Sequence, residues 1–319
     1  MRRMSVKALL AALVAVVAAT LPSPAAADDG SRLVAITDQR YDNHAAARIR
    51  LLDPDVADWG SAAAQRWTWH PTSNNGFGGL TGAWGLPTDV KLRKDRAGAY
   101  VAVVSDSRGL AALVTYPGGR RVWGVNAGAP SNPHSVELLP DGNVAVAASH
   151  GNFVRVYTAS QGASSARYTQ YTLADAHGVH WDPARRVLWA LGKTELVALT
   201  VGGTAAAPTL TRSHAWALPT SGGHDLAPAL EDDDVLWIST SSHVYRYSKS
   251  RDAAVATYPL ATVKSVSSMP NGQQVRTAPK AGCRTGWCTD TVTFRGPDFT
   301  RTRPGAQIYK ARVWSSRYR

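Results

Sequence analysis

The sequence predicts an all-β fold, a six-bladed β-propeller, on three observations. Short apolar or alternating runs are separated by Gly, Pro, Asp and Asn, and almost no segment shows helical periodicity. A degenerate unit recurs at intervals of 40 to 47 residues, which is the length of a four-stranded blade. The chain ends just after the first strand of a sixth unit, and the strands that would complete this unit lie near the other end of the chain.

The first 27 residues predict a secretory signal peptide. Residues 2–7 carry three basic side chains, residues 8–21 are apolar and uncharged, and the alanines at 25–27 offer a cleavage site. The apolar run is shorter than the about 20 residues of a membrane span, so we expect no membrane anchor. The mature chain, residues 28–319, is then expected to be one secreted propeller domain.

The sequence contains two cysteines, Cys283 and Cys288, in the run Cys-Arg-Thr-Gly-Trp-Cys. In an oxidising compartment two cysteines this close in one loop predict a local disulfide. The alternatives are free thiols or a metal site, but no further metal ligands lie nearby in the sequence. We therefore expect the two cysteines to form a disulfide bond that closes the loop between them.

The formal charge is +12, and it stays positive after loss of the leader. The basic residues are scattered and no nucleic-acid-binding motif is present, so nucleic acid is not an expected partner. The charge either serves solubility or attracts anionic polymers outside the cell, such as acidic polysaccharides and oligosaccharides.

Each repeated unit opens with a polar residue and a short alternating segment, followed by a strongly apolar strand and a third strand. The six predicted unit starts are Asp89, His134, His177, His224, Lys264 and Lys310. The segments at 33–38, 47–54 and 65–69 would supply the missing strands of the sixth unit, so strands from both termini would close the propeller. Seven blades is the alternative, if residues 59–86 hide further strands.

The unit starts should form a ring around the central channel, because the first strand of each propeller blade lines it. His134, His177 and His224 come from consecutive units, so three imidazoles are expected to face one axial site. An ordinary core role, with each ring bonded to a backbone carbonyl, is the competing interpretation. Three neutral imidazoles could hold a divalent metal. Alternatively, one of them could act as a general base.

A base beside cations suits β-elimination at a uronate, in which the proton next to a carboxylate is removed. Either lysine of the ring, Lys264 or Lys310, or Arg312 could neutralise that carboxylate. His134 or His177 could take the proton, and Tyr309 or a second histidine could protonate the leaving oxygen. Asp89 completes the ring as a substrate-binding residue. Two further assignments are weaker. His150 could bind substrate at the channel mouth or lie in a turn, and the tryptophans Trp67, Trp69 and Trp84 could stack on sugar rings or serve packing.

Four segments carry a resemblance to known proteins, namely residues 132–148, 176–183, 222–226 and 309–314. Over nearly the whole mature chain the sequence resembles a family of secreted actinobacterial propeller proteins without an assigned activity. More distantly, the Asn-Pro-His-Ser motif and the histidine-bearing units are similar to propeller polysaccharide lyases. These are the lyases that release rhamnosyl caps from glucuronate on gum arabic and the oligogalacturonate lyases, which have an axial histidine-rich metal site. The resemblance implies β-elimination at a uronate, and it carries over to His134, His177 and His224 only.

The expected function is therefore a secreted, monomeric polysaccharide lyase acting on a uronate in the axial channel. A non-catalytic binder of acidic glycans and a metal-dependent hydrolase or lactonase on the same scaffold are the alternatives, because propellers host many functions.

Overall fold

The computed structural model describes residues 32–317, and the predicted signal peptide lies outside the described residues. Within this range the protein is all-β, with 24 strands, five short 3-10 helices and no α-helix. Among residues 32–317, moreover, no helix has the length and apolar character needed to cross a membrane. The prediction of an all-β fold is confirmed.

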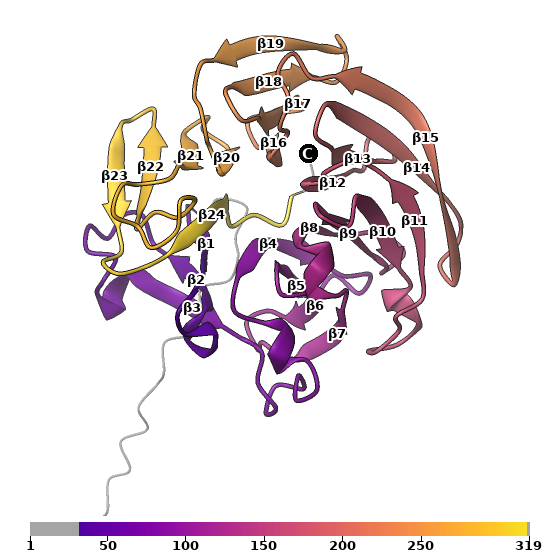
Figure 1. The fold of residues 1–319 in the computed structure, drawn as a ribbon, viewed down its shortest axis with the longest axis horizontal. Coiled ribbons are helices and arrows are strands. Elements are labelled where there is room, and N and C mark those ends of the chain that lie inside the picture. The colour runs from indigo at the N-terminus through magenta and orange to yellow at the C-terminus, as the bar shows by residue number, and fades with distance from the viewer. Residues whose placement is uncertain (1–31, 318–319) are drawn as a thin grey trace, which may run out of the picture.

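The strands form four sheets of four strands and one sheet of eight (Figure 1). The strands of the first three units are β1 (Val34–Asp38), β2 (Arg48–Leu52), β3 (Gln65–Trp69), β4 (Pro87–Lys94), β5 (Tyr100–Asp106), β6 (Leu110–Thr115), β7 (Arg121–Asn126), β8 (Pro133–Leu138), β9 (Val144–Ala148), β10 (Phe153–Tyr157) and β11 (Tyr168–Thr172). The remaining strands are β12 (Gly178–Asp182), β13 (Val187–Leu191), β14 (Glu195–Thr204), β15 (Ala207–Ala217), β16 (Asp225–Ala229), β17 (Asp232–Ser239), β18 (Val244–Ser248), β19 (Ala253–Tyr258), β20 (Ser265–Ser268), β21 (Gln274–Thr277), β22 (Thr291–Arg295), β23 (Phe299–Thr302) and β24 (Ile308–Val313). The 3-10 helices are η1 (His44–Ala46), η2 (Ala62–Ala64), η3 (Thr81–Ala83), η4 (Ala129–Ser131) and η5 (Ala159–Gln161).

Each unit is an antiparallel meander, and Figure 1 shows the units arranged radially with β4, β8, β12, β16, β20 and β24 innermost. The eight-stranded sheet consists of two such meanders, β16–β19 and β20–β23, joined by a single parallel pairing of Ala229 with Ser268. The predicted partnership of the two ends is present, because β24 pairs antiparallel with β1. No sheet within the described range closes on itself.

The segment 59–86 adds one strand to the fold, β3, which completes the sheet of β24, β1 and β2. The rest of this segment packs against Trp69 of β3 in an aromatic cluster. Trp69 lies edge-on to Phe77 and to Trp84, with ring centroids 5.5 and 5.3 Å apart. Trp84 is buried and donates its indole N–H to the Ala47 carbonyl oxygen.

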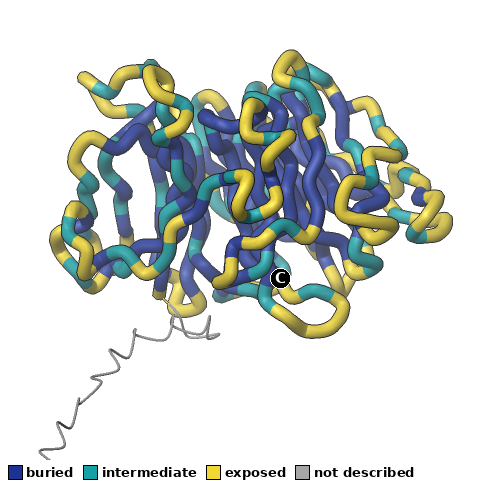
Figure 2. The backbone as a smooth tube through the Cα atoms, turned by 90° about the horizontal axis from the view of Figure 1, so that it is seen from below, coloured by how far each residue is buried: buried dark blue, intermediate teal, exposed yellow. Residues whose placement is uncertain are grey.

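Hydrophobic side chains fill the spaces between neighbouring sheets, and the exposed residues lie mostly in the loops and at the rim (Figure 2). The alternation of each inner strand sends one set of side chains into these layers and the other toward the axis. In β8, for example, Val136 and Leu138 join an apolar cluster, whereas Ser135 and Glu137 are buried in polar contacts. The inner strands thereby surround the axis with polar side chains.

Candidate functional site

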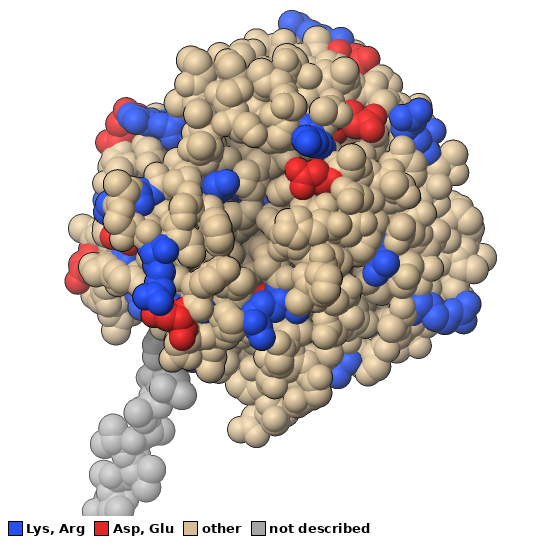
Figure 3. Space-filling view, in the orientation of Figure 1, with Lys and Arg blue, Asp and Glu red and all other residues tan. Residues whose placement is uncertain are grey.

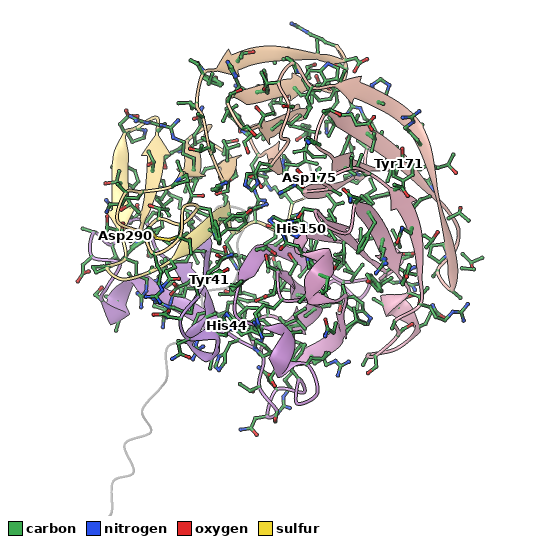
Figure 4. All side chains as sticks on the ribbon, viewed as in Figure 1. Tyr41, His44, His150, Tyr171, Asp175 and Asp290 are labelled. Atoms are coloured by element: carbon green, nitrogen blue, oxygen red, sulfur yellow. A yellow bond between two sulfur atoms is a disulfide. The ribbon has the colours of Figure 1, made fainter. Side chains whose placement is uncertain are left out.

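A cavity of about 540 Å³ opens near the axis of the molecule. It is lined by the three predicted histidines together with Lys264, Tyr309 and others. The space-filling view shows a hollow near the middle of the face (Figure 3), and Asp175, His150 and Tyr41 lie around this central region (Figure 4). Four of the six predicted unit starts therefore line one cavity, and the other two, Asp89 and Lys310, do not.

The three imidazoles are neighbours, as the sequence predicts. The ring centroids of His134 and His177 are 4.4 Å apart, and those of His177 and His224 are 4.7 Å apart. Tyr309 adjoins both ends of this row, with its ring 5.7 Å from His134 and 5.8 Å from His224. His150 also lines the cavity, on its exposed side.

A recurring backbone conformation positions these side chains. Two residues before each of four cavity residues, the chain adopts a positive φ, which turns it out of the preceding connection and into the inner strand. The four turning residues are Asn132 (φ 54°), Asp175 (φ 51°), Gly222 (φ 78°) and Thr262 (φ 60°). Asn, Asp and Gly tolerate this conformation better than other residues, so the pattern Asn-x-His, Asp-x-His and Gly-x-His is a readable sequence signal.

The tautomers of His134 and His177 follow from their backbone contacts. The Nδ1 atom of His134 lies 2.9 Å from the Asn132 carbonyl oxygen, and that of His177 lies 2.8 Å from the Asp175 carbonyl oxygen. A carbonyl oxygen can only accept a hydrogen bond, so Nδ1 carries the proton in each ring. Each Nε2 atom therefore keeps its lone pair, which is the state that a general base needs.

His224 is held in the opposite way. Its Nε2 atom accepts a hydrogen bond from the Lys264 ammonium group at 2.9 Å and lies 3.4 Å from the Tyr309 hydroxyl. Because an ammonium group can only donate, Nε2 is the unprotonated nitrogen and a proton resides on Nδ1 of the neutral ring. That buried Nδ1 atom has no hydrogen-bond partner among the described residues.

Burial and neighbouring cations keep these groups in forms suited to proton transfer. Burial and then the neighbouring His177 hold the pKa of His134 and of His224 well below the usual 6.5. Burial also lowers the pKa of His177, against the opposing effect of Asp175. Burial, followed by the Asp225 carboxylate, raises the pKa of Tyr309 well above its usual 10. At neutral pH the cavity therefore presents neutral imidazoles and a protonated phenol.

Asp89 and Lys310 do not line the cavity, contrary to the predicted ring, and neither does Arg312, which was predicted to neutralise the substrate carboxylate. In β24 the residue that lines the cavity is Tyr309, directly before Lys310. At β4 it is Leu86, which directly precedes the strand and lies three positions before Asp89. Arg312 donates to Asp89 at 2.9 Å and makes two hydrogen bonds to Asp225. Lys310 forms an ion pair with Asp225 at 2.9 Å.

A second buried ionic group, which the sequence analysis did not identify, continues the axis below this layer. Arg93 forms a bidentate pair with Glu137, with both distances 2.7 Å. Lys91 lies between the two groups, 3.5 Å from Asp89 and 3.6 Å from Glu137. These charges are paired and hydrogen-bonded, so each is compensated by a partner within the protein.

The alternative of a metal held by three histidines does not fit the residues present. Within residues 32–317 no group of three or more His, Cys, Asp or Glu side chains is placed to hold a metal ion. The third ring explains this: Nε2 of His224 accepts from the Lys264 ammonium group, so only His134 and His177 offer a free Nε2 lone pair. We derive no step through a metal.

The cavity carries an excess of positive charge. Lys264 and Arg108 both line it, and in the described part of the chain neither has a carboxylate oxygen within 4.0 Å. Asp175 is the carboxylate at the cavity, and it lies 3.3 Å from His177. Arg108 and Asp175 were not identified from the sequence; Asp175-Ala-His177 repeats the spacing of Asn132-Pro-His134, which was the available signal for the aspartate.

The disulfide prediction is confirmed, because Cys283 and Cys288 are bonded, with Cα atoms 5.7 Å apart. The stapled loop reaches the cavity, where Trp287 is part of the lining.

The depressed imidazole pKa values can be measured directly. We expect NMR titration of the imidazole nitrogens to show His134 and His224 still neutral at pH 6.5, with the proton of His134 on Nδ1. Replacing Lys264 with methionine removes one of the positive charges that depress the pKa of His224, so that pKa should rise. A midpoint for His224 at or above 6.5 in the wild-type protein would contradict this description of the site.

Comparison with solved structures identifies the fold class. The WD40 β-propeller domain of Doa1 matches with a TM-score of 0.55 and 9% identity, covering 79% of this chain and 74% of that one. A protein of unknown function from Bacteroides caccae matches with a TM-score of 0.53 and 11% identity, covering 88% and 97%. Hydrazine synthase of Kuenenia stuttgartiensis has a TM-score of 0.46 at 13% identity, covering 70% of this chain and 66% of that one, and carries no argument.

These likenesses show a propeller-like fold and nothing about activity, because the identities are so low. A search of curated proteins finds no match to the sequence. At the level of families, residues 1–316 match the description "Family of unknown function (DUF6528)". The more distant resemblance to propeller lyases stays a prediction.

Proposed function

The chain belongs to the DUF6528 family of unknown function, and we propose that it is an exported six-bladed β-propeller that cleaves uronate-containing glycans by β-elimination in its axial cavity. Six blades follow if each half of the eight-stranded sheet is counted as one blade, since the halves share only the Ala229–Ser268 pairing. The pairing of β24 with β1 then joins the first and last parts of the chain in one blade.

One observation carries the proposal: an ammonium group and a phenol meet at one neutral imidazole, next to two further imidazoles with free Nε2 lone pairs. Lys264 lies 2.9 Å and Tyr309 3.4 Å from Nε2 of His224. A cation to bind a carboxylate, a base and a protonated acid are the three groups that elimination next to a carboxylate requires.

The reaction can be written with these residues in defined roles. Lys264 binds the uronate carboxylate and stabilises the negative charge that develops on it. Nε2 of His134 or His177 takes the proton from C5 while the electron pair forms the C4=C5 double bond and the C4–O bond breaks. Tyr309 donates its proton to the departing oxygen. Transfer of the proton from the imidazolium back to the tyrosinate restores both groups.

The charge of the cavity supports an acidic substrate over a neutral one. Two cations, Lys264 and Arg108, lack carboxylate partners there, and the ammonium of Lys310 lies just below the floor, 3.4 Å from the carbonyl oxygen of His134. A uronate carboxylate would supply the missing counter-charge. The resemblance to propeller lyases and the predicted signal peptide, which would bring the protein among such polymers outside the cell, support the same choice.

The proposal predicts that Lys264 is needed for binding of acidic glycans. We expect Lys264→Met to weaken the binding of a glucuronate-containing oligosaccharide about 10- to 100-fold, since a charge-assisted hydrogen bond contributes about 1.5–3 kcal/mol. Wild-type binding should weaken as salt is raised, and the variant should respond less to salt. Isothermal titration calorimetry at two salt concentrations measures both effects.

Lys94→Met is the matched control, because Lys94 is an exposed lysine at the far end of β4 from the cavity. Its binding should equal that of the wild type. Equal binding by Lys264→Met and the wild type would rule out this lysine as the carboxylate-binding group. Binding without any unsaturated product would identify a glycan-binding protein instead of a lyase.

A further inference from the structure

The cavity has an aromatic rim on one side. Of the five large hydrophobic side chains that are exposed in the described part of the chain, two line this cavity: Tyr41, 49% exposed, and Trp287, 37% exposed. Their rings are in contact, with centroids 5.9 Å apart and an angle of 66° between the planes. The tryptophans considered for sugar stacking serve packing instead. Trp69 and Trp84 are buried in the core, and Trp67 packs against Tyr116 and Trp314 and does not line this cavity.

The polar contacts of Trp287 fix the orientation of its ring. The indole N–H donates to Oε1 of Gln39 at 3.2 Å, and Gln39 is itself buried and donates from Nε2 to the Pro87 carbonyl oxygen at 3.1 Å. Gln39 directly follows β1 and Pro87 begins β4, so the ring is tied to the first two units of the fold. Its position therefore does not depend on its own loop alone.

The loop that carries Trp287 is also held at its base. The disulfide joins Cys283 to Cys288, the residue directly after the tryptophan, and Cys288 is fully buried. The Lys280 backbone N–H donates to the Cys288 carbonyl oxygen at 3.0 Å. An exposed aromatic ring that is held this firmly before binding avoids much of the entropic cost of ordering it on a ligand.

Tyr41 is fixed by the neighbouring segment. Its backbone N–H donates to Oε1 of Gln307 at 3.2 Å, while the backbone N–H of Gln39 donates to the Gln307 carbonyl oxygen at 3.0 Å. Gln39, which holds the Trp287 indole, and Gln307, which holds the Tyr41 backbone, are thus hydrogen-bonded to each other. Neither aromatic ring is needed to fill the core, since each remains more than a third exposed.

The chemistry of the cavity indicates what such a rim would bind. The face of an aromatic ring is electron-rich, so it attracts either cations or the polarised C–H groups of a sugar ring. A cationic ligand is disfavoured by Lys264 and Arg108, which leave the cavity positively charged. A pyranose ring offers an apolar C–H face for the aromatics and hydroxyl groups for the polar walls.

We propose that Trp287, with Tyr41 beside it, forms a second sugar subsite that stacks on a neutral pyranose next to the uronate in an oligosaccharide. This inference deepens the proposed function and rests on it for the placement of the uronate at Lys264. The ligand is thus an acidic oligosaccharide in which the charged residue occupies the imidazole end of the cavity and its neighbour lies against the aromatic rim.

Calorimetric titration with three ligands tests the subsite: the methyl glycoside of glucuronic acid, a glucuronate-containing tetrasaccharide and a neutral tetrasaccharide. Trp287→Ala should weaken binding of the acidic tetrasaccharide about 10-fold or more and leave that of the methyl glycoside within about twofold. Trp287→Phe, which keeps an aromatic face, should retain most of the affinity. Tyr168→Ala removes a similarly exposed aromatic ring on β11, away from the cavity, and should change nothing.

Unchanged binding of the acidic tetrasaccharide by Trp287→Ala would overturn the subsite. An equal loss for the methyl glycoside and the tetrasaccharide would overturn it too, since Trp287 would then act on the uronate position itself. If the wild type binds the neutral tetrasaccharide but neither acidic ligand, and Trp287→Ala abolishes that binding, the subsite stands and the proposed function fails. No binding of any of the three ligands by the wild type overturns both.

Discussion

Replacing Arg312 with methionine is expected to lower the free energy of unfolding by about 3–5 kcal/mol. Arg312 is buried and bonded to both Asp89 and Asp225, so its loss leaves two buried carboxylates short of a counter-charge. In the wild type, opposing their burial, the Arg312 guanidinium holds the pKa of each carboxyl below its usual range. Chemical denaturation of the wild type and the variant at pH 7 measures the difference.

The sign of the pH dependence follows from those pKa values. A carboxyl whose pKa is depressed in the folded state contributes stability above its unfolded pKa of about 3.9, and this contribution is lost as the pH falls toward the folded value. In Arg312→Met the two carboxyls lose their main stabilising cation, so they are protonated more easily in the folded state. The difference in stability between the two proteins should therefore shrink as the pH is lowered below about 4.

Two control variants separate burial from charge. Lys280→Gln breaks the Lys280–Asp290 pair, whose lysine side chain is 50% exposed, and should change stability by at most about 1 kcal/mol. Combining Arg312→Met with Asp89→Asn removes one buried charge of each sign, leaves Asp225 paired with Lys310 and Lys91 beside Glu137, and should recover part of the loss. If Arg312→Met is as stable as the wild type, the ion pairs of Arg312 with Asp89 and Asp225 do not stabilise the fold.

Replacing Tyr309 with phenylalanine is expected to lower kcat about 10²- to 10⁴-fold, because the variant lacks the proton donor for the leaving oxygen. KM should change little, since the aromatic ring remains in place between His134 and His224. The rate is followed by the ultraviolet absorbance of the unsaturated uronate. Tyr171→Phe, on β11 at the outside of the fold, is the matched control and should keep full activity (Figure 4).

Measuring kcat of His134→Gln and His177→Gln in the same assay would show which histidine is the general base. One of them should lose activity as severely as Tyr309→Phe, and the other less. Full activity in all three variants would show that Tyr309, His134 and His177 do not carry out the proposed proton transfers.

Much of the site was predictable because the repeat fixes the register of most inner strands. His134, His177, His224 and Lys264 share one cavity because each lies two residues after a turning residue, and the turn recurs with the repeat. The blade-like periodicity similarly predicted the all-β fold and the pairing of the terminal strands.

The register failed at Asp89 and Lys310 for a physical reason. Irregular pairing lies at both places, between Pro87 and Asp89 in β4 and where β24 pairs with β1 beyond Ile36. The irregularity in β4 matches the one between Pro133 and Ser135 in β8, so the β4 residue equivalent to His134 is Thr88 and the predicted Asp89 is one position late. A bulge adds one residue and changes which side chain faces the axis, and a sequence does not show where it occurs. At both positions two polar residues adjoin, Thr88 with Asp89 and Tyr309 with Lys310, so alternation could not decide between them.

Trp287 was missed because it lies in an irregular loop between β21 and β22. No periodic pattern predicts the path of such a loop, and its approach to Gln39 joins residues 248 positions apart in the sequence. The two flanking cysteines indicated a fixed loop but not the place to which it was fixed.

The most direct test of the central claim is whether the purified protein makes an unsaturated uronate from a polysaccharide or oligosaccharide whose glucuronate carries another sugar at O4. We expect a rise in ultraviolet absorbance with the wild-type protein, no metal requirement, and a greatly reduced rise with Tyr309→Phe. Absence of any unsaturated product from glucuronate- and galacturonate-containing glycans, with a folded wild-type protein, would contradict the account.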